Sequence, residues 1–370
     1  MRSFLAFVWR YLLGALLTLT PFTAVLVVGW TQRAAARSVA RRWHAQAGHR
    51  PADFPAFARA EEDSAALAVW PRWIMADDAG ALFAAARRAG PFRGLGFIVR
   101  ALFGSLWLNA KAGVRALVPV AIVMAPVSAL LLFSWWSGWE NSFNKGYEQA
   151  WVGPTIAFIG IAYFVVAMTL VPLAEMRQAV NNSWRAFFDF AFLRRAAREV
   201  RLGLIGLAVL FMTAGFVVAV LKVAPLPLGN AIERPADTER LLQQYPLLVA
   251  AILFPLYLML RLAAARVYAK AATRIAAKGG AETLAARERA LIERLALDGG
   301  AAPKRGALAR VAAGTSSLTA GVVASALMFA LWFGLVGELY VSQFLVHDWT
   351  HWAFHPLVQL PWVGGIFSPR

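Results

Sequence analysis

The chain is 370 residues long, and 60% of its residues are hydrophobic while only 15% are charged. A soluble domain carries roughly a quarter charged residues, so this chain must use hydrocarbon as part of its solvent. Its net charge of +17 comes without a recognised nucleic-acid-binding motif, and its lack of cysteine excludes disulfides and thiolate metal sites. We therefore expect a membrane protein whose basic loops meet anionic lipid headgroups, with no nucleic acid as partner.

Six apolar stretches are long enough to cross a bilayer as helices, which takes about 20 residues. None of them contains Asp, Glu, Lys or Arg in its interior. The sequence predicts an all-α fold, a polytopic transmembrane helical bundle with interfacial amphipathic helices and no large soluble domain. The expected spans are residues 11–30, 116–136, 152–173, 202–221, 245–260 and 317–336.

The first span contains Pro21 near its middle, and its apolar character begins already at Phe4. The apolar run is longer than the core of a leader peptide and ends without a small-residue cleavage site, so we expect a retained anchor. Proline removes a helical hydrogen bond. A kinked helix is therefore expected here, with a re-entrant hairpin as the alternative.

Most Lys and Arg residues fall in three segments, 33–115, 177–201 and 261–310. Basic loops stay on the cytoplasmic side of a membrane, so these segments are expected inside and both termini outside. Arg2 and Arg10, ahead of the first span, weakly oppose an outward N-terminus. The Ala- and Arg-rich composition suggests a bacterium, which makes the cell inner membrane the expected location.

The expected organisation follows from these spans and their orientation. Residues 97–115 place polar and apolar side chains on opposite halves of a helical wheel, which predicts an interfacial helix lying flat before the second span. The third basic loop is expected to extend the fifth span as a basic helix over 261–278 that ends at Gly279 and Gly280. A charged helix with an apolar face follows, and a solvated hairpin is favoured over a docking site for a partner. That face consists of Leu284, Leu291, Ile292 and Leu295. The segments are a first span with a short outward N-terminus (1–30), a cytoplasmic segment with the interfacial helix (31–115), spans two to five with a basic elbow helix (116–263), a basic cytoplasmic helical loop (264–316), the sixth span (317–339) and an outward aromatic, His-containing tail (340–370).

The charge-free spans argue against an ion-coupled carrier, which needs an ionisable group near the middle of the membrane. Glu175 and Glu338 stand at the ends of spans, where we expect headgroup water to reach them. Prolines in the spans favour plain kinks over broken helices that line a substrate site, because neighbouring helices and hydroxyl side chains tolerate them.

The sixth span carries a face of small residues at four-residue spacing. Small residues let helix backbones approach closely in a membrane. Packing within the monomer is the default expectation, and packing against another chain is the alternative. The face consists of Ala313, Ser317, Gly321 and Ser325.

The tail holds the sharpest polar pattern, with histidines at positions 347, 351 and 355. In a helix these side chains share one face, and two histidines at i and i+4 can share a metal ion. His347 and His355 would be about 12 Å apart at a helical rise of 1.5 Å per residue, so His351 would belong to either pair. The alternative is an amphipathic helix in the aromatic belt, anchored by Trp349 and Trp352.

The sequence lacks a nucleotide-binding loop, a nucleophile elbow and a His-Glu-x-x-His motif. This absence makes an enzyme less expected, and a metal ion at the three histidines is the one cofactor indicated. The favoured function is an accessory, assembly or scaffolding subunit of a membrane complex, with membrane lipids and other membrane proteins as partners. A permease or lipid-handling channel without charge coupling is the first alternative, and a metal-dependent membrane enzyme is the second.

Overall fold

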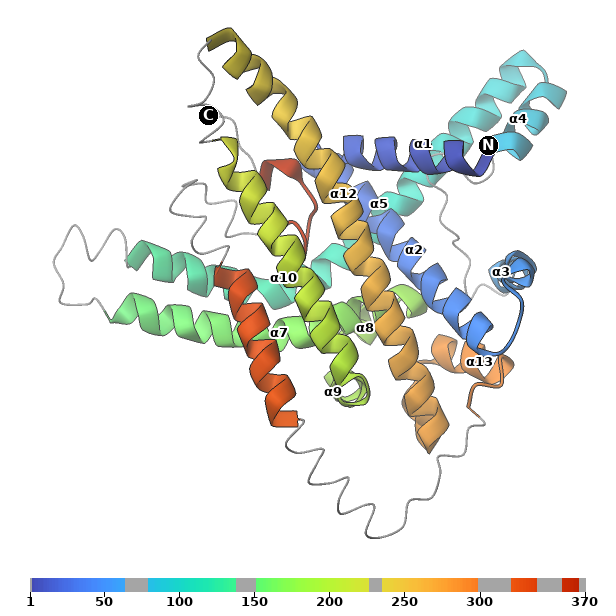
Figure 1. Ribbon diagram of the computed structural model, residues 1–370. Coiled ribbons are helices and arrows are strands. Elements are labelled where there is room, and N and C mark those ends of the chain that lie inside the picture. The colour runs from blue at the N-terminus through green and yellow to red at the C-terminus, as the bar shows by residue number, and fades with distance from the viewer. Residues whose placement is uncertain are drawn as a thin grey trace.

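The regular structure of the chain is helical wherever it is described, which confirms the predicted all-α class. Figure 1 shows long helices that cross one another rather than a set of parallel rods. The computed structural model describes residues 2–63, 79–137, 151–225, 235–298, 321–337 and 355–365.

The first predicted span is two helices rather than one kinked helix. Helix α1 (Arg2–Leu17) and helix α2 (Pro21–Gln46) meet at a corner, with α1 lying across the top of the view in Figure 1. Thr20 caps α2 by accepting a hydrogen bond from the Thr23 amide at 3.2 Å, and Pro21 occupies the first turn. Proline is suited to a helix start, where its missing N–H is not needed. Pro21, at which a kink was expected, therefore begins a new helix.

The second predicted span belongs to a much longer helix. After 3₁₀ helix η1 (Pro51–Asp53), α3 (Phe54–Asp63) and α4 (Ala79–Arg88), helix α5 runs without a break from Pro91 to Trp136. The expected flat helix over 97–115 is therefore in line with the span and does not turn into it. No proline or strong turn signal separates the two parts, so nothing interrupts the backbone hydrogen bonds before Pro119.

Helix α7 (Val152–Asn181) returns along α5, and the two form a pair that projects to the left in Figure 1. Two short helices follow, α8 (Trp184–Phe187) and α9 (Phe190–Glu199). Asp189 caps α9 by accepting a hydrogen bond from the Phe192 amide at 3.1 Å. This short basic elbow leads the chain from α7 into the next long helix.

Helices α10 (Arg201–Val223) and α12 (Pro235–Ile275) run side by side, steeply inclined to the α5–α7 pair (Figure 1). Helix α12 continues well beyond the predicted end of its span at Leu260. It passes into the turns η4 (Ala276–Gly280) and η5 (Ala281–Thr283) and then into α13 (Ala286–Arg294). The last described element is the 3₁₀ helix η6 (Val363–Gly365).

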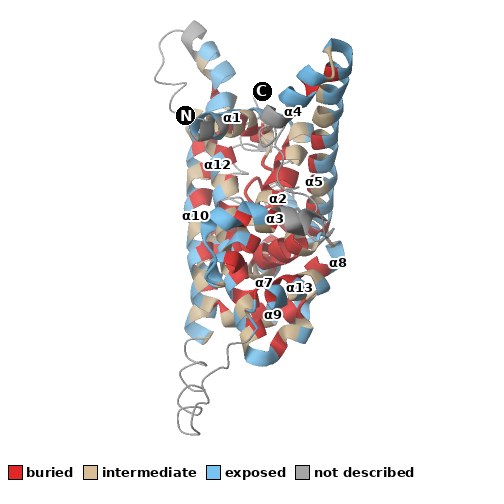
Figure 2. Cartoon of the chain, turned by 90° about the vertical axis from the view of Figure 1, so that its right-hand side faces the viewer, coloured by how far each residue is buried: buried red, intermediate tan, exposed pale blue. Residues whose placement is uncertain are grey.

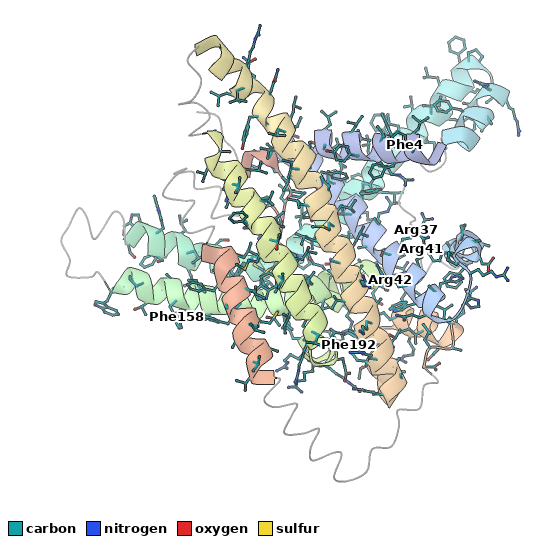
Figure 3. The ribbon with its side chains drawn as sticks, viewed as in Figure 1. Phe4, Arg37, Arg41, Arg42, Phe158 and Phe192 are labelled. Atoms are coloured by element: carbon teal, nitrogen blue, oxygen red, sulfur yellow. The ribbon has the colours of Figure 1, made fainter. Side chains whose placement is uncertain are left out.

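The architecture is that of a multi-pass integral membrane protein. Among the described residues, four helices are long and apolar enough to cross a membrane, and two shorter apolar helices correspond to parts of the first and sixth predicted spans. Large apolar side chains face outward, such as Phe158 on α7, which points away from the fold in Figure 3. The four are Pro91–Trp136, Val152–Asn181, Arg201–Val223 and Glu239–Thr283, and the two shorter ones are Phe7–Leu17 and Gly321–Gly337.

The core lies where α2, α7 and α12 meet. Its largest enclosed side chains include Trp43 of α2, Met176 of α7 and Tyr268 of α12. Figure 2 shows buried residues concentrated around α7, α9 and α13, at the end of the molecule where the basic loops join the helices. That end is therefore a packed assembly of helices.

Candidate anion-binding site

The predicted metal ligands fall largely outside the described residues, which include neither His347 nor His351. His355 is buried, and its Nδ1 accepts a hydrogen bond from the Leu357 amide at 3.3 Å. Among the described residues, no three His, Asp or Glu side chains are grouped in a way that could hold a metal ion. The three-histidine site therefore stays a prediction.

The small-residue face of the helix Gly321–Gly337 is described only in part, since Ser317 lies outside the described residues. Ser325 is exposed, and its hydroxyl donates to the Gly321 carbonyl at 2.9 Å. A Cβ added at Gly321 would lie 3.3 Å from a guanidinium nitrogen of Arg201. Met328, Trp332, Leu335 and Val336 continue the same helical face toward the C-terminal end of this helix, and all four are buried.

Glu175, expected at a water-accessible span end, is instead only 3% exposed. Its carboxylate forms an ion pair with the guanidinium of Arg261, which is equally buried. Arg261 also donates to the Tyr257 hydroxyl and to the Val358 carbonyl, both at 2.8 Å. The expectation was wrong because α12 packs on α7 and places Arg261 beside Glu175, which the sequence does not reveal.

A second buried polar cluster begins two residues later on α7. Arg177 donates to Asp189 at 2.7 Å and lies 3.5 Å from a carboxylate oxygen of Glu288. Glu288 is fully buried and accepts hydrogen bonds from the Tyr268 hydroxyl and, at 2.7 Å, from the Asn181 amide. Desolvation raises the pKa of Glu288, and the Arg177 charge opposes that rise. The cluster ties α13 to both α7 and α12.

The third basic loop is thus not the solvated hairpin that the sequence suggests. Besides Glu288, the side chains of Leu291 and Ile292 on α13 are buried against the core. Helical periodicity did indicate this apolar face, but the burial of a carboxylate beside it depends on Arg177 from a distant segment. Because α13 is held in this way, the position of Arg287, the residue before Glu288, is fixed as well.

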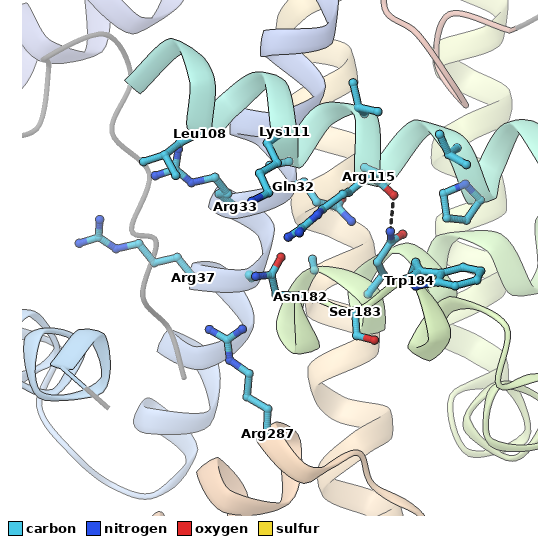
Figure 4. A pocket seen from close by; sticks show the side chains of 18 residues that line it. Gln32, Arg33, Arg37, Leu108, Lys111, Arg115, Asn182, Ser183, Trp184 and Arg287 are labelled. Atoms are coloured by element: carbon cyan, nitrogen blue, oxygen red, sulfur yellow. Dashed lines mark hydrogen bonds between the residues drawn. The ribbon is translucent and has the colours of Figure 1, made fainter. Parts of the chain in front are cut away.

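A cavity of about 510 Å³ lies beside these clusters, between α2, α5, α7, α8 and α13. We call it the basic cavity. Arg33 is buried, Arg37 and Arg287 are half-buried, and Lys111 and Arg115 are exposed. Figure 4 shows Arg287 reaching up from α13 toward the α2 and α5 side. Its cationic lining residues are Arg33 and Arg37 from α2, Lys111 and Arg115 from α5, and Arg287 from α13.

The described lining of the basic cavity is cationic, since it includes five Arg and Lys side chains and no Asp or Glu. Burial lowers the pKa of Arg287 to about 10, so its guanidinium is still charged at neutral pH. Like charges gathered in a partly desolvated space repel one another. An anion would relieve that repulsion and accept hydrogen bonds from several donors at once.

Neutral polar groups complete the inner wall. Gln32 donates from its side chain to the Glu175 carbonyl at 2.8 Å, and Gln178 donates to the Arg115 carbonyl at 2.5 Å. The side-chain oxygen of Gln178 and the Nε of Arg287 are buried without a hydrogen-bond partner among the described residues. Buried polar atoms are normally satisfied, so these two indicate space for a ligand or water.

The outer rim of the basic cavity is apolar and exposed. Val114 and Val118 on α5 and Trp184 on α8 line it, each with about half or more of its surface accessible. Side chains of this kind suit lipid tails or the membrane interface. The site therefore joins a cationic interior to an apolar exit, which is an amphiphilic arrangement.

Comparison with protein-family models, with curated proteins and with solved structures finds no match to this chain. The geometry of the cavity is therefore what indicates its chemistry. In the sequence, four of its cations belong to the first basic segment and Arg287 to the third. One signal was available, because Arg33 and Arg37, like Lys111 and Arg115, are spaced by four residues and so share a helix face. Nothing in the sequence indicates that the two faces meet.

Proposed function

We propose that this protein is a lipid-handling membrane protein that binds the anionic headgroup of a membrane amphiphile in the basic cavity. The observation that carries the proposal is the convergence of five cationic side chains, with no acidic residue among the described residues that line the cavity. The proposal includes the orientation expected from charge, with the basic loops on the cytoplasmic side of a bacterial inner membrane and both termini outside. Basic pockets between transmembrane helices on that side are suited to phosphate headgroups.

The chemistry of the lining favours a phosphate-bearing lipid over a zwitterionic one. Arginine offers planar, bidentate hydrogen bonding to phosphate oxygens, and Arg33, Arg37, Arg115 and Arg287 line the cavity. A choline or ethanolamine group would need a carboxylate or an aromatic cage, and an added amine would meet repulsion here. The apolar rim at Val114 and Val118 supports an amphiphile over a small soluble anion.

The test measures lipid binding to the purified protein in detergent by native mass spectrometry. Phosphatidylglycerol is titrated against phosphatidylcholine with the same acyl chains. Phosphatidylglycerol should bind more tightly, and Lys111→Ala and Arg287→Ala should each weaken it about tenfold. Each removed charge-assisted hydrogen bond contributes about 1.5–3 kcal/mol, and 1.4 kcal/mol corresponds to about tenfold in affinity.

The matched control is Arg100→Ala, which removes an exposed cation from the same helix α5 but outside the cavity lining. Equal binding of the two lipids, or equal effects of Arg100→Ala and Lys111→Ala, would contradict the proposal. Displacement of the lipid by inorganic phosphate at similar concentration would point to a soluble anion instead. Co-purification of a stoichiometric protein would support the scaffold hypothesis, and bound metal lost in His351→Ala would support the metal enzyme.

A further inference from the structure

A second basic site lies on the lateral surface between α10 and α12, in a groove of about 560 Å³ that we call the α10–α12 groove. It shares no lining residue with the basic cavity. Arg266, Lys270 and Arg274 of α12 are exposed and, at four-residue spacing, lie along one face of the helix. Arg198 and Arg201 add two cations from the end of α9 and the start of α10.

The groove is polar at one end and apolar at the other. A Cβ added at Gly203 would lie 3.1 Å from a methyl carbon of Val267, which sets the antiparallel register of the two helices. The cations at Arg201 and Lys270 therefore share one end, and Leu207 and Leu210 lie further along α10, toward the interior of its apolar span. The space above Gly206 is open, since a Cβ there would meet nothing within 4 Å.

Among the described lining residues, the cations of the groove outnumber the acids. Glu199 is the one carboxylate among the described lining residues, and Lys278 already engages it at 2.6 Å. Neither Arg266 nor Lys270 has an ion-pair partner in the part of the chain that the structure describes. Burial lowers the pKa of Arg42 on α2, and the charge of Arg266 lowers it further. Positive charge is therefore crowded around Arg266, which an anion would offset.

We propose that the α10–α12 groove binds an anionic phospholipid of the surrounding bilayer, with its phosphate on Arg266 and Lys270 and one acyl chain along Gly206, Leu207 and Leu210. The charge of the basic end selects the headgroup. The apolar floor selects a lipid over a soluble phosphate, because each methylene of a buried acyl chain adds to the binding free energy. The occupant is a lipid of the annulus, held on the outside of the helices, and this inference does not depend on the proposed function of the basic cavity.

The experiment counts phosphatidylglycerol molecules retained by the purified full chain in native mass spectrometry. Two variants test the two halves of the site. The double variant Arg266→Gln/Lys270→Gln removes the charges that face the phosphate. Gly206→Leu leaves every charge in place and fills the floor, and the open space at this glycine lets the fold accept the larger side chain. Each variant should lose one bound lipid relative to the unaltered protein.

Two controls separate this site from the basic cavity and from charge in general. Arg194→Gln, an exposed cation of α9 outside both linings, should retain the full number of lipids. Lys111→Ala should lose a lipid from the cavity, and combining it with Gly206→Leu should lose two. Full retention of lipid by either groove variant overturns the inference. Displacement of the groove lipid by soluble glycerol phosphate at equal concentration overturns it as well, since the acyl chain would then contribute nothing.

Discussion

At the scale of single residues, the buried pair of Glu175 and Arg261 has a consequence for stability. Two charges taken out of water stabilise the fold only while they face each other, because each has lost its hydration. Arg261 serves a second purpose by donating to the Val358 carbonyl at 2.8 Å, which ties the C-terminal segment to α12. The position of Glu175 at the end of a predicted span indicates headgroup water and gives no sign of this pairing.

We predict that Arg261→Met destabilises the protein by about 3–5 kcal/mol, the usual consequence of leaving one buried charge unpaired. Adding Glu175→Leu should recover much of that loss, because the buried carboxylate left without its partner is then removed as well. The measurement is reversible unfolding in detergent mixtures. The exposed ion pair of Lys278 with Glu199 supplies the control. Lys278 is 53% exposed, so Lys278→Met should cost less than about 1 kcal/mol. Equal losses in the single and double core variants would show that the pair is not buried as a unit.

At the scale of elements, two glycines set how closely α2 and α5 cross. A Cβ at Gly29 would collide with the Asn109 carbonyl oxygen, and one at Gly113 would collide with the Val25 carbonyl oxygen. The two backbones are therefore in direct contact, as small residues permit between membrane helices. Just beyond this crossing, Arg33 donates to the Asn109 side chain at 2.7 Å and lines the basic cavity. The crossing thus positions the cationic wall.

We predict that Gly29→Ala lowers thermal stability in detergent by an amount typical of overpacking, about 1–3 kcal/mol. It should also weaken phosphatidylglycerol binding, because separating α2 from α5 widens the cavity. Gly104→Ala is the matched control on α5, where a Cβ meets nothing within 4 Å. Alanine is the better helix former by about 1 kcal/mol, so this control should be neutral or stabilising. A Gly29→Ala protein as stable as the Gly104→Ala protein would contradict the close crossing.

At the scale of the whole molecule, the lack of native cysteine makes the proposed orientation testable. Single cysteines are introduced at Glu239 and Ala52, both exposed positions in the structure. In intact cells an impermeant thiol reagent should label Glu239→Cys and leave Ala52→Cys unlabelled, because basic segments stay inside. Both should react after the membrane is opened with detergent. Labelling of Ala52→Cys in intact cells would reverse the orientation and place the basic cavity on the outer side.

The sequence by itself determined the helical class and the position of most apolar runs. The predicted spans 116–136, 152–173 and 202–221 lie within α5, α7 and α10 because hydropathy is a local property of consecutive residues. Helix boundaries were less predictable. Pro21 begins a helix instead of kinking one, and residues 97–115 continue directly into the span within α5, since capping and packing decide where a helix starts and stops.

Only the tertiary structure decided which charges meet. Glu175 and Arg261 are far apart in sequence, and each alone looks like a solvated residue at the end of a span. Their pairing follows from the packing of α7 on α12. The basic cavity has the same origin, because Arg33, Lys111 and Arg287 come from three segments whose individual patterns indicate ordinary basic loops. A local pattern records which face of a helix is polar, whereas the partner of that face depends on contacts between distant parts of the chain.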